Sequence, residues 1–112
     1  MDWIDLSTPK QIQDIQEKSS AVPCLIYKHS TTCSISMMAR MRLERAWAFE
    51  KEEVLPYFLN VLDYRSLSDA VSDTFHIEHE SPQILLIRDG SCVHQASHFD
   101  IDLKAVQAVL AS

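Results

Sequence analysis

The residues that could carry out chemistry gather in one stretch, His29-Ser30-Thr31-Thr32-Cys33-Ser34-Ile35-Ser36. It follows an apolar run, Pro23 to Tyr27, and it leads into a long segment with helical spacing that starts at Ser34. A cysteine at a strand-to-helix junction has its sulfur near free backbone N–H groups and the positive end of the helix dipole, which favour thiolate over thiol. Because thiolate is the form that attacks disulfides, the stretch predicts thiol–disulfide exchange at Cys33.

Length and composition bound the kind of protein. With 112 residues, 46% hydrophobic and 23% charged, residues 1–112 fit a single globular domain. The net charge of −6 argues against a nucleic-acid partner, because phosphate binding needs clustered Lys and Arg. No apolar run approaches the roughly 18 residues of a membrane span, and Met1-Asp2-Trp3-Ile4-Asp5 lacks the pattern of a signal peptide. We therefore expect a cytoplasmic protein without a membrane partner.

The chain contains three cysteines, Cys24, Cys33 and Cys92. An odd count in a reducing compartment argues against a disulfide framework, so at least one thiol must be free. Cys24 lies inside the apolar run and is predicted to be a buried small hydrophobe. Cys92 follows a turn, and a resolving or regulatory role for it stays open.

The first half of the chain predicts strand, helix, strand, helix. Residues 3–6 alternate weakly, as in a short edge strand, and Thr8, Pro9 and Gln11 have the spacing of a helix start. Residues 22–27 predict a strand covered on both faces. A helix is expected from Ser34 to about Glu50, with Arg42 inside its apolar stripe. That stripe comprises Ile35, Met38, Ala39, Leu43, Ala46 and Phe49.

The second half predicts a strand within residues 57–62 ending near Asp63, then a short helix opened by Ser66 with Asp69. Strands at residues 83–88 and 91–96 flank an Asp89-Gly90 hairpin turn. Asp100 is expected to cap a last helix that buries Leu103, Val106, Val109 and Leu110. This order predicts an α/β fold of the thioredoxin-like type: a central mixed sheet of four to five strands with helices on both faces. The loop with Cys33 then lies at the carboxyl edge of the sheet.

Two motifs resemble those of thioredoxin-fold oxidoreductases. Cys33-Ser34-Ile35-Ser36 is similar to their Cys-x-x-Cys motif with serine as the second member, and Ser81-Pro82-Gln83 resembles the loop that carries their cis-proline. Together with the Trp3-Ile4 segment and the short acidic chain, Thr32-Cys33-Ser34-Ile35-Ser36 resembles the monothiol bacilliredoxins of the YtxJ type. Ser34 departs from that family, which often has proline at this position.

The resemblance implies removal of the low-molecular-weight thiol bacillithiol from client proteins that carry it in a mixed disulfide. Cys33 would be the attacking thiolate and would become bacillithiolated itself. Ser36 cannot resolve that disulfide, so another bacillithiol or a protein reductant must do so. Bacillithiol is then a co-substrate, and no tightly bound cofactor is expected.

The other candidate site residues are expected to support Cys33 or to contact the substrate, and for several of them a purely structural role is the alternative. Ser36 is predicted to donate a hydrogen bond to the Cys33 thiolate, or else to be a solvated helix serine. If the bond before Pro82 is cis, the backbone of Ser81 lies beside Cys33 and can pair with an extended client segment; the alternative is an ordinary trans proline. Contacts to the substrate are also expected from Thr32, Ser34 and Ile35, while Thr31 either shares this role or only turns the chain.

Two other classes of function remain as alternatives. One is a non-catalytic thioredoxin-fold binding or adaptor module in which Cys33 is only a structural remnant, and the other is an iron–sulfur carrier like the monothiol glutaredoxins. The histidines are spaced as pairs, but these spacings need not converge in a loop or at a strand end, so no zinc site is expected. His29 either tunes the pKa of Cys33 or only ends its strand. The five histidines are His29, His76, His79, His94 and His98.

Overall fold

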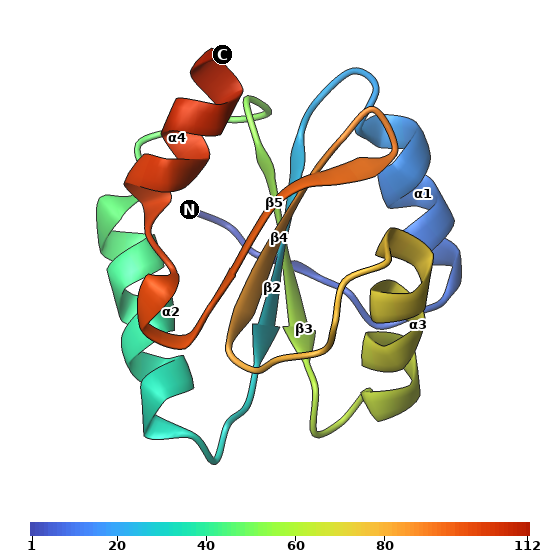
Figure 1. Ribbon diagram of the computed structural model, residues 1–112, viewed down its shortest axis with the longest axis vertical. Coiled ribbons are helices and arrows are strands. Elements are labelled where there is room, and N and C mark those ends of the chain that lie inside the picture. The colour runs from blue at the N-terminus through green and yellow to red at the C-terminus, as the bar shows by residue number, and fades with distance from the viewer.

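A five-stranded sheet lies between two pairs of helices in the computed structural model, which describes all of residues 1–112 (Figure 1). The strands run in the order β1-β3-β2-β4-β5. Helices α1 and α3 cover one face of the sheet, and α2 and α4 cover the other. The strands are β1 (Ile4–Asp5), β2 (Cys24–His29), β3 (Leu55–Asn60), β4 (Gln83–Arg88) and β5 (Ser91–Ser97). The helices are α1 (Lys10–Lys18), α2 (Ser34–Ala46), α3 (Arg65–Phe75) and α4 (Leu103–Ala111), with a 3₁₀ turn, η1 (His98–Asp100), before α4.

Strand direction agrees with the predicted mixed sheet. β1, β3 and β2 are parallel, β4 is antiparallel to β2, and β5 is antiparallel to β4. The central strand β2 is buried along its whole length, as expected for a strand with helices on both faces. No helix is both long and apolar enough to cross a membrane.

The core consists of two layers, one on each face of the sheet. Successive side chains of a strand point to opposite faces, so neighbouring residues of β2 enter different layers. Cys24 and Ile26 pack with the side chains of α1 and α3, whereas Leu25 and Tyr27 pack with those of α2 and α4. This division explains why the strand reads as a continuous apolar run.

The hairpin between β4 and β5 forms at the predicted Asp89-Gly90 turn. Asp89 and Gly90 have φ values of 54° and 78°, the left-handed conformations that a tight two-residue hairpin requires. Their N–H groups donate to Ser19, at 2.9 Å to its carbonyl oxygen and 2.8 Å to its hydroxyl. The turn is thereby tied to the end of α1.

Helix α2 is shorter than predicted, and its buried face contains only part of the predicted apolar stripe. It ends at Ala46 rather than near Glu50, because Trp47 adopts an extended conformation with ψ 116°. Phe49 therefore packs edge-on against Trp47 at a centroid distance of 5.0 Å, outside the helix. The predicted apolar stripe is also wrong at Met38 and Ala46, which are exposed, and Arg42 is exposed too.

The buried face of α2 consists of Ser36, Ala39 and Leu43, which follow the i, i+3, i+7 spacing of one helix face. Met38 and Arg42 each precede a member of this face by one residue, so they lie about 100° around the helix from it. The predicted stripe contained Ala39 and Leu43 correctly, but it included the exposed Met38 and omitted the buried Ser36.

Other element boundaries differ by one to three residues. β3 ends at Asn60, because residues 61–63 form a turn in which the Leu62 N–H donates to Asn60 Oδ1 at 3.1 Å. α3 begins at Arg65 after Tyr64, so Ser66 lies inside the helix and does not cap it.

The helix caps were also predicted incompletely. The cap of α4 is Asp102 rather than Asp100, because the Asp102 carboxylate accepts from the Lys104 N–H at 3.0 Å while Asp100 lies in η1. In α4, residues 109 and 110 are only half-buried. At α1, only the return bond of the predicted capping box forms: Gln11 Oε1 accepts from the Thr8 N–H at 3.0 Å.

Candidate active site

Cys33 lies between the carboxyl end of β2 and the first turn of α2, at the sheet edge where the sequence placed it (Figure 1). Its backbone is extended, with φ −109° and ψ 117°, and it is the last residue before the helix. The Cys33 N–H donates to the Ser30 carbonyl oxygen at 3.2 Å, and the Cys33 carbonyl oxygen accepts from the Met37 N–H at 3.2 Å. These two bonds fix the cysteine at the helix start while its thiol stays partly exposed.

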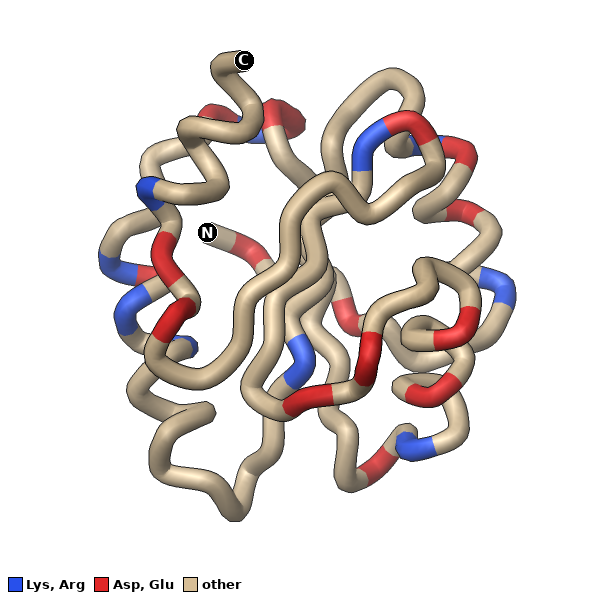
Figure 2. Tube along the Cα trace, in the orientation of Figure 1, with Lys and Arg blue, Asp and Glu red and all other residues tan.

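The thiol pKa of Cys33 lies below its ordinary value, mainly because the backbone N–H of Ser36 binds the thiolate. Partial burial acts in the opposite direction, and the Ile35 N–H and the Ser36 hydroxyl lower the pKa further. Residues 30–39 contain no charged side chain, so this loop is uniformly uncoloured in Figure 2. The acidity of Cys33 therefore comes from the groups at the helix start rather than from a neighbouring cation.

Ser36 is fully buried and cannot be a solvated helix serine. Its hydroxyl oxygen accepts from the Ser30 N–H at 3.3 Å, and its carbonyl oxygen accepts from the Tyr27 hydroxyl at 2.6 Å. The position one turn from Cys33 is thus held from two sides by the loop and the central strand.

A Ser36→Ala variant is expected to raise the pKa of Cys33, because it removes one donor to the thiolate and keeps both N–H donors. The alkylation rate at pH 7 should fall by about two- to fivefold, the effect of one hydrogen bond worth roughly 0.5–1 kcal/mol. The measurement is iodoacetamide alkylation against pH. Ser34→Ala is the matched control, since Ser34 is exposed and does not act on the thiol; equal profiles for the two variants would contradict the assignment.

The remaining predicted contact residues surround the thiol on its solvent side. Thr32 and Ser34 are exposed and Ile35 is half-exposed. The Thr32 hydroxyl lies 3.3 Å from that of Ser30. Their predicted contacts to a bound substrate stay predictions.

Ser81 and Pro82 lie at the same sheet edge as Cys33. The Ser81–Pro82 peptide bond is cis, as the sequence resemblance implied. β4 pairs with β2 so that Gln83 is opposite Lys28, which places the preceding Pro82 beside the end of β2. The Pro82 carbonyl oxygen accepts from the His98 N–H at 3.0 Å, whereas the backbone N–H and carbonyl of Ser81 have no backbone partner. Ser81 therefore offers a free donor and acceptor at this edge.

This geometry, a single partly exposed cysteine at a helix start beside a cis-proline, is accompanied by a match to a family model. The model is described as monothiol bacilliredoxin BrxC, and it matches residues 4–106. The chain belongs to the monothiol bacilliredoxin family. The predicted family is thereby confirmed.

Solved structures confirm the thioredoxin-like fold of this family member. One similar structure is a proposed oxidoreductase with a thioredoxin fold, at 28% identity and a TM-score of 0.81, covering 96% of this chain and 92% of that chain. Thioredoxin from Trypanosoma brucei brucei has 11% identity and a TM-score of 0.75, covering 99% and 93%. The short form of spinach chloroplast thioredoxin f has 14% identity and a TM-score of 0.69, covering 95% and 91%.

The other two cysteines lie far from the bacilliredoxin site. In the sheet register Cys24 pairs with Ile87, and Ile87 pairs with Cys92, so these cysteines are separated by two strand spacings, about 10 Å. Both lie level with the start of β2, whereas Cys33 follows its end, about 17 Å along the strand. Burial raises the pKa of both thiols, that of Cys24 to about 11. A resolving disulfide from Cys92 to Cys33 within one chain is therefore excluded.

His29 does not act on Cys33. It is buried, its Nδ1 lies 3.4 Å from the Tyr27 hydroxyl, and its ring lies 5.0 Å from that of Phe58. Burial lowers the pKa of His29. No three His, Cys, Asp or Glu side chains lie close enough together to hold a metal ion.

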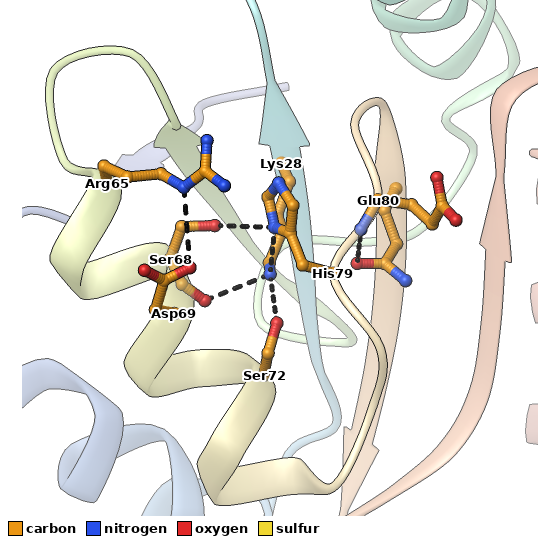
Figure 3. A network of polar contacts seen from close by, with 8 residues as sticks. Lys28, Arg65, Ser68, Asp69, Ser72, His79 and Glu80 are labelled. Atoms are coloured by element: carbon orange, nitrogen blue, oxygen red, sulfur yellow. Dashed lines mark hydrogen bonds and ion pairs between the residues drawn. The ribbon is translucent and has the colours of Figure 1, made fainter.

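The sequence reasoning missed Lys28, which follows the apolar run and is fully buried (Figure 3). Its Nζ donates to the Ser72 hydroxyl at 2.7 Å, the Ser68 carbonyl oxygen at 3.1 Å and His79 Nδ1 at 3.2 Å. No carboxylate forms an ion pair with it, and burial lowers its pKa to about 8. The available signal was strand alternation, since Lys28 shares the face of Cys24 and Ile26.

The low pKa of Lys28 predicts a specific pH dependence of stability. The unfolded lysine has a pKa of about 10.4, so between pH 8 and 10.4 the unfolded chain holds more protons than the folded one. The free energy of unfolding should therefore rise with pH in this window, relative to a Lys28→Met variant, by on the order of 3 kcal/mol. Below pH 8 the difference in the free energy of unfolding between the two proteins should no longer change with pH.

The measurement is urea unfolding of both proteins from pH 7 to pH 10. The buried Cys24 thiol is common to both, so its opposite pH effect cancels in the difference. Lys10→Met is the control for the loss of one lysine, because Lys10 is exposed and Lys28 is buried. A difference that is flat with pH would mean that Lys28 keeps an ordinary pKa.

Proposed function

We propose that this protein is a monothiol thiol–disulfide oxidoreductase of the cytoplasm that removes bacillithiol from S-bacillithiolated proteins. The observation that carries the proposal is Cys33: a thiol of lowered pKa at a helix start, with Ser36 where a dithiol enzyme has its second sulfur. The family match supports thiol redox chemistry. The lowered pKa argues against an adaptor with an inert cysteine, and no observation favours an iron–sulfur carrier.

The first step is an exchange of disulfide partners. The Cys33 thiolate attacks the bacillithiol sulfur of the client's mixed disulfide, and the sulfur–sulfur bond to the client breaks. The client thiolate leaves and takes up a proton from solvent. The product is a disulfide between Cys33 and bacillithiol, so the oxidised bond has moved and no electrons are gained or lost overall.

The second step needs a thiol from outside the chain. The Ser36 hydroxyl is not ionised and cannot expel bacillithiol, while Cys24 and Cys92 are out of reach. A second bacillithiol thiolate attacks the bound bacillithiol sulfur and releases Cys33, with bacillithiol disulfide as the product; alternatively, a protein reductant supplies the thiol. Bacillithiol is thus a co-substrate rather than a resident cofactor.

The client is held, in this proposal, by the free backbone groups of Ser81. An extended client segment can add to the edge next to Pro82 and form main-chain hydrogen bonds there. Thr32, Ser34 and Ile35 border the thiol on the exposed side and would contact the bacillithiol moiety. This arrangement would align the three sulfurs in the line that exchange requires.

The proposed substrate is tested with one client protein that carries either bacillithiol or 2-mercaptoethanol on the same cysteine. The wild-type protein is mixed with each form, and the released client thiol is followed with time. We expect release from both forms, faster for bacillithiol. Equal rates would reduce the proposal to general thiol exchange, and no release from either would refute it.

A further inference from the structure

The segment before Pro82 is held by two buried polar side chains from neighbouring strands. Lys28 of β2 and Gln83 of β4 are direct partners in the sheet register, so their side chains lie on the same face. Both are buried and both reach into the loop of residues 76–82. We call this pair the Lys28–Gln83 clamp.

Each member of the clamp binds a different part of the loop. Lys28 Nζ donates to His79 Nδ1 at 3.2 Å (Figure 3). Gln83 Nε2 donates to the Glu78 carbonyl oxygen at 3.0 Å. Gln83 Oε1 also accepts from the Glu80 N–H at 3.3 Å. Three consecutive residues are therefore held, and the next one along the chain is Ser81, which has the free backbone groups.

His79 completes the link to α3. Its Nδ1 lies 3.2 Å from the Ser68 hydroxyl as well as from Lys28 Nζ. Because the ammonium group of Lys28 can only donate, Nδ1 must be the unprotonated nitrogen of a neutral ring. The contact between the loop and Lys28 of β2 therefore forms only while His79 is neutral.

We infer that Lys28 and His79 are positioning residues for the reaction: they hold Ser81 and Pro82 in place for a protein client, and protonation of His79 releases that hold. The inference rests on the proposed function, since it assigns client pairing to Ser81. It adds to the proposed function a way of holding the client, since neither Lys28 nor His79 contacts the Cys33 thiol. The rate of exchange with small disulfides, which do not need the Ser81 backbone, should not depend on Lys28 or His79.

The charges around His79 set the direction of the pH response. Lys28 from β2 and Arg65 from α3 disfavour a second cation, while Asp69 from α3 and Glu80 of the loop favour it. Burial and Lys28 prevail, so the pKa of His79 lies below its ordinary value. On the far side, His98 of η1 faces Glu80 at 3.8 Å. A protonated His79 would lose its acceptor role and would place two cations 3.2 Å apart, which disfavours the contact between Lys28 and the loop.

The ring is open to protons from solvent on one side. His79 is half-buried, and it lines a surface hollow of about 590 Å³. The other lining residues of the hollow are Asp69, Ser72, Asp73, His76, Ile77 and Glu78.

The test compares two reactions of the same protein: exchange with a bacillithiolated client and exchange with a small aromatic disulfide. His79→Ala removes the acceptor for Lys28 and should lower kcat/KM for the client about tenfold, mostly through KM, with the small-disulfide rate within twofold of wild type. His79→Gln keeps a neutral acceptor oxygen and should restore the client rate at pH 7.5. His76→Asn is the matched control, because His76 is exposed in the same loop and asparagine tolerates its left-handed backbone.

Measuring both reactions as a function of pH distinguishes a positioning role of His79 from simple structural support. For wild type, the ratio of client rate to small-disulfide rate should fall as the pH is lowered from 7.5 to 4.5, and for His79→Gln it should stay constant. A ratio that falls equally in both proteins, or a His79→Ala variant with normal client kinetics, would overturn the inference. If the small disulfide also fails to react at Cys33, the proposed function itself fails.

Discussion

A Cys33→Ser variant is expected to release no bacillithiol from a modified client, a loss of roughly a thousandfold or more in the exchange rate. Serine preserves the size of the side chain, and its hydroxyl is not ionised at neutral pH and is a poor nucleophile toward sulfur. Cys33 is partly exposed and outside both core layers, so the fold should be unchanged. The measurement is the appearance of free client thiol, followed for both proteins at equal concentration.

The control for this variant is Cys92→Ser. Cys92 lies on β5 level with the start of β2, at the opposite end from the helix start that holds Cys33. It should therefore keep the wild-type exchange rate. Equal release by wild type and Cys33→Ser would show that another group performs the reaction.

A Ser36→Cys variant should convert the single-cysteine site into a dithiol site. Ser36 is one helical turn from Cys33, and its hydroxyl already acts on the thiolate. The introduced thiolate can attack the Cys33 sulfur of the mixed disulfide, expel bacillithiol and leave an intramolecular disulfide. Intact mass after reaction with one equivalent of bacillithiolated client should thus show loss of two hydrogens rather than a bacillithiol adduct.

Ser34→Cys is the matched control for this conversion. Ser34 is also a serine of the first turn, but it directly follows Cys33 in sequence and is exposed. A disulfide between adjacent residues is strained, so this variant should keep the adduct as the wild type does. If Ser36→Cys also keeps the adduct, the side chain at position 36 does not point toward the Cys33 sulfur, which would contradict the structure.

Features that depend on local chemistry were predictable from the sequence. The Asp89-Gly90 turn follows from residues that accept positive φ, and Cys33 at the helix start follows from an apolar strand next to a helical repeat. The cis bond before Pro82 could not be derived from the local residues, because most such bonds are trans. The family resemblance offered cis as one of two alternatives, and the structure has the cis bond.

Features that depend on tertiary packing were not predictable. Lys28 is polar yet fully buried, because α3 and the loop before β4 supply its partners. Ser36 is also fully buried, because the folded loop brings the Ser30 N–H to its hydroxyl. Met38 is apolar yet exposed, because the face of α2 that meets the sheet is one residue out of phase with it. Only the register of β2 and β4 reveals that Lys28 and Gln83 reach the same loop.

The most direct test of the account is the mass of the Cys33 peptide after wild-type protein reacts with one equivalent of bacillithiolated client and no reductant. We predict one bacillithiol on Cys33, none on Cys24 or Cys92, and an adduct that persists until bacillithiol is added. An unmodified Cys33 after complete release of the client thiol, or an adduct on Cys92, would contradict the account.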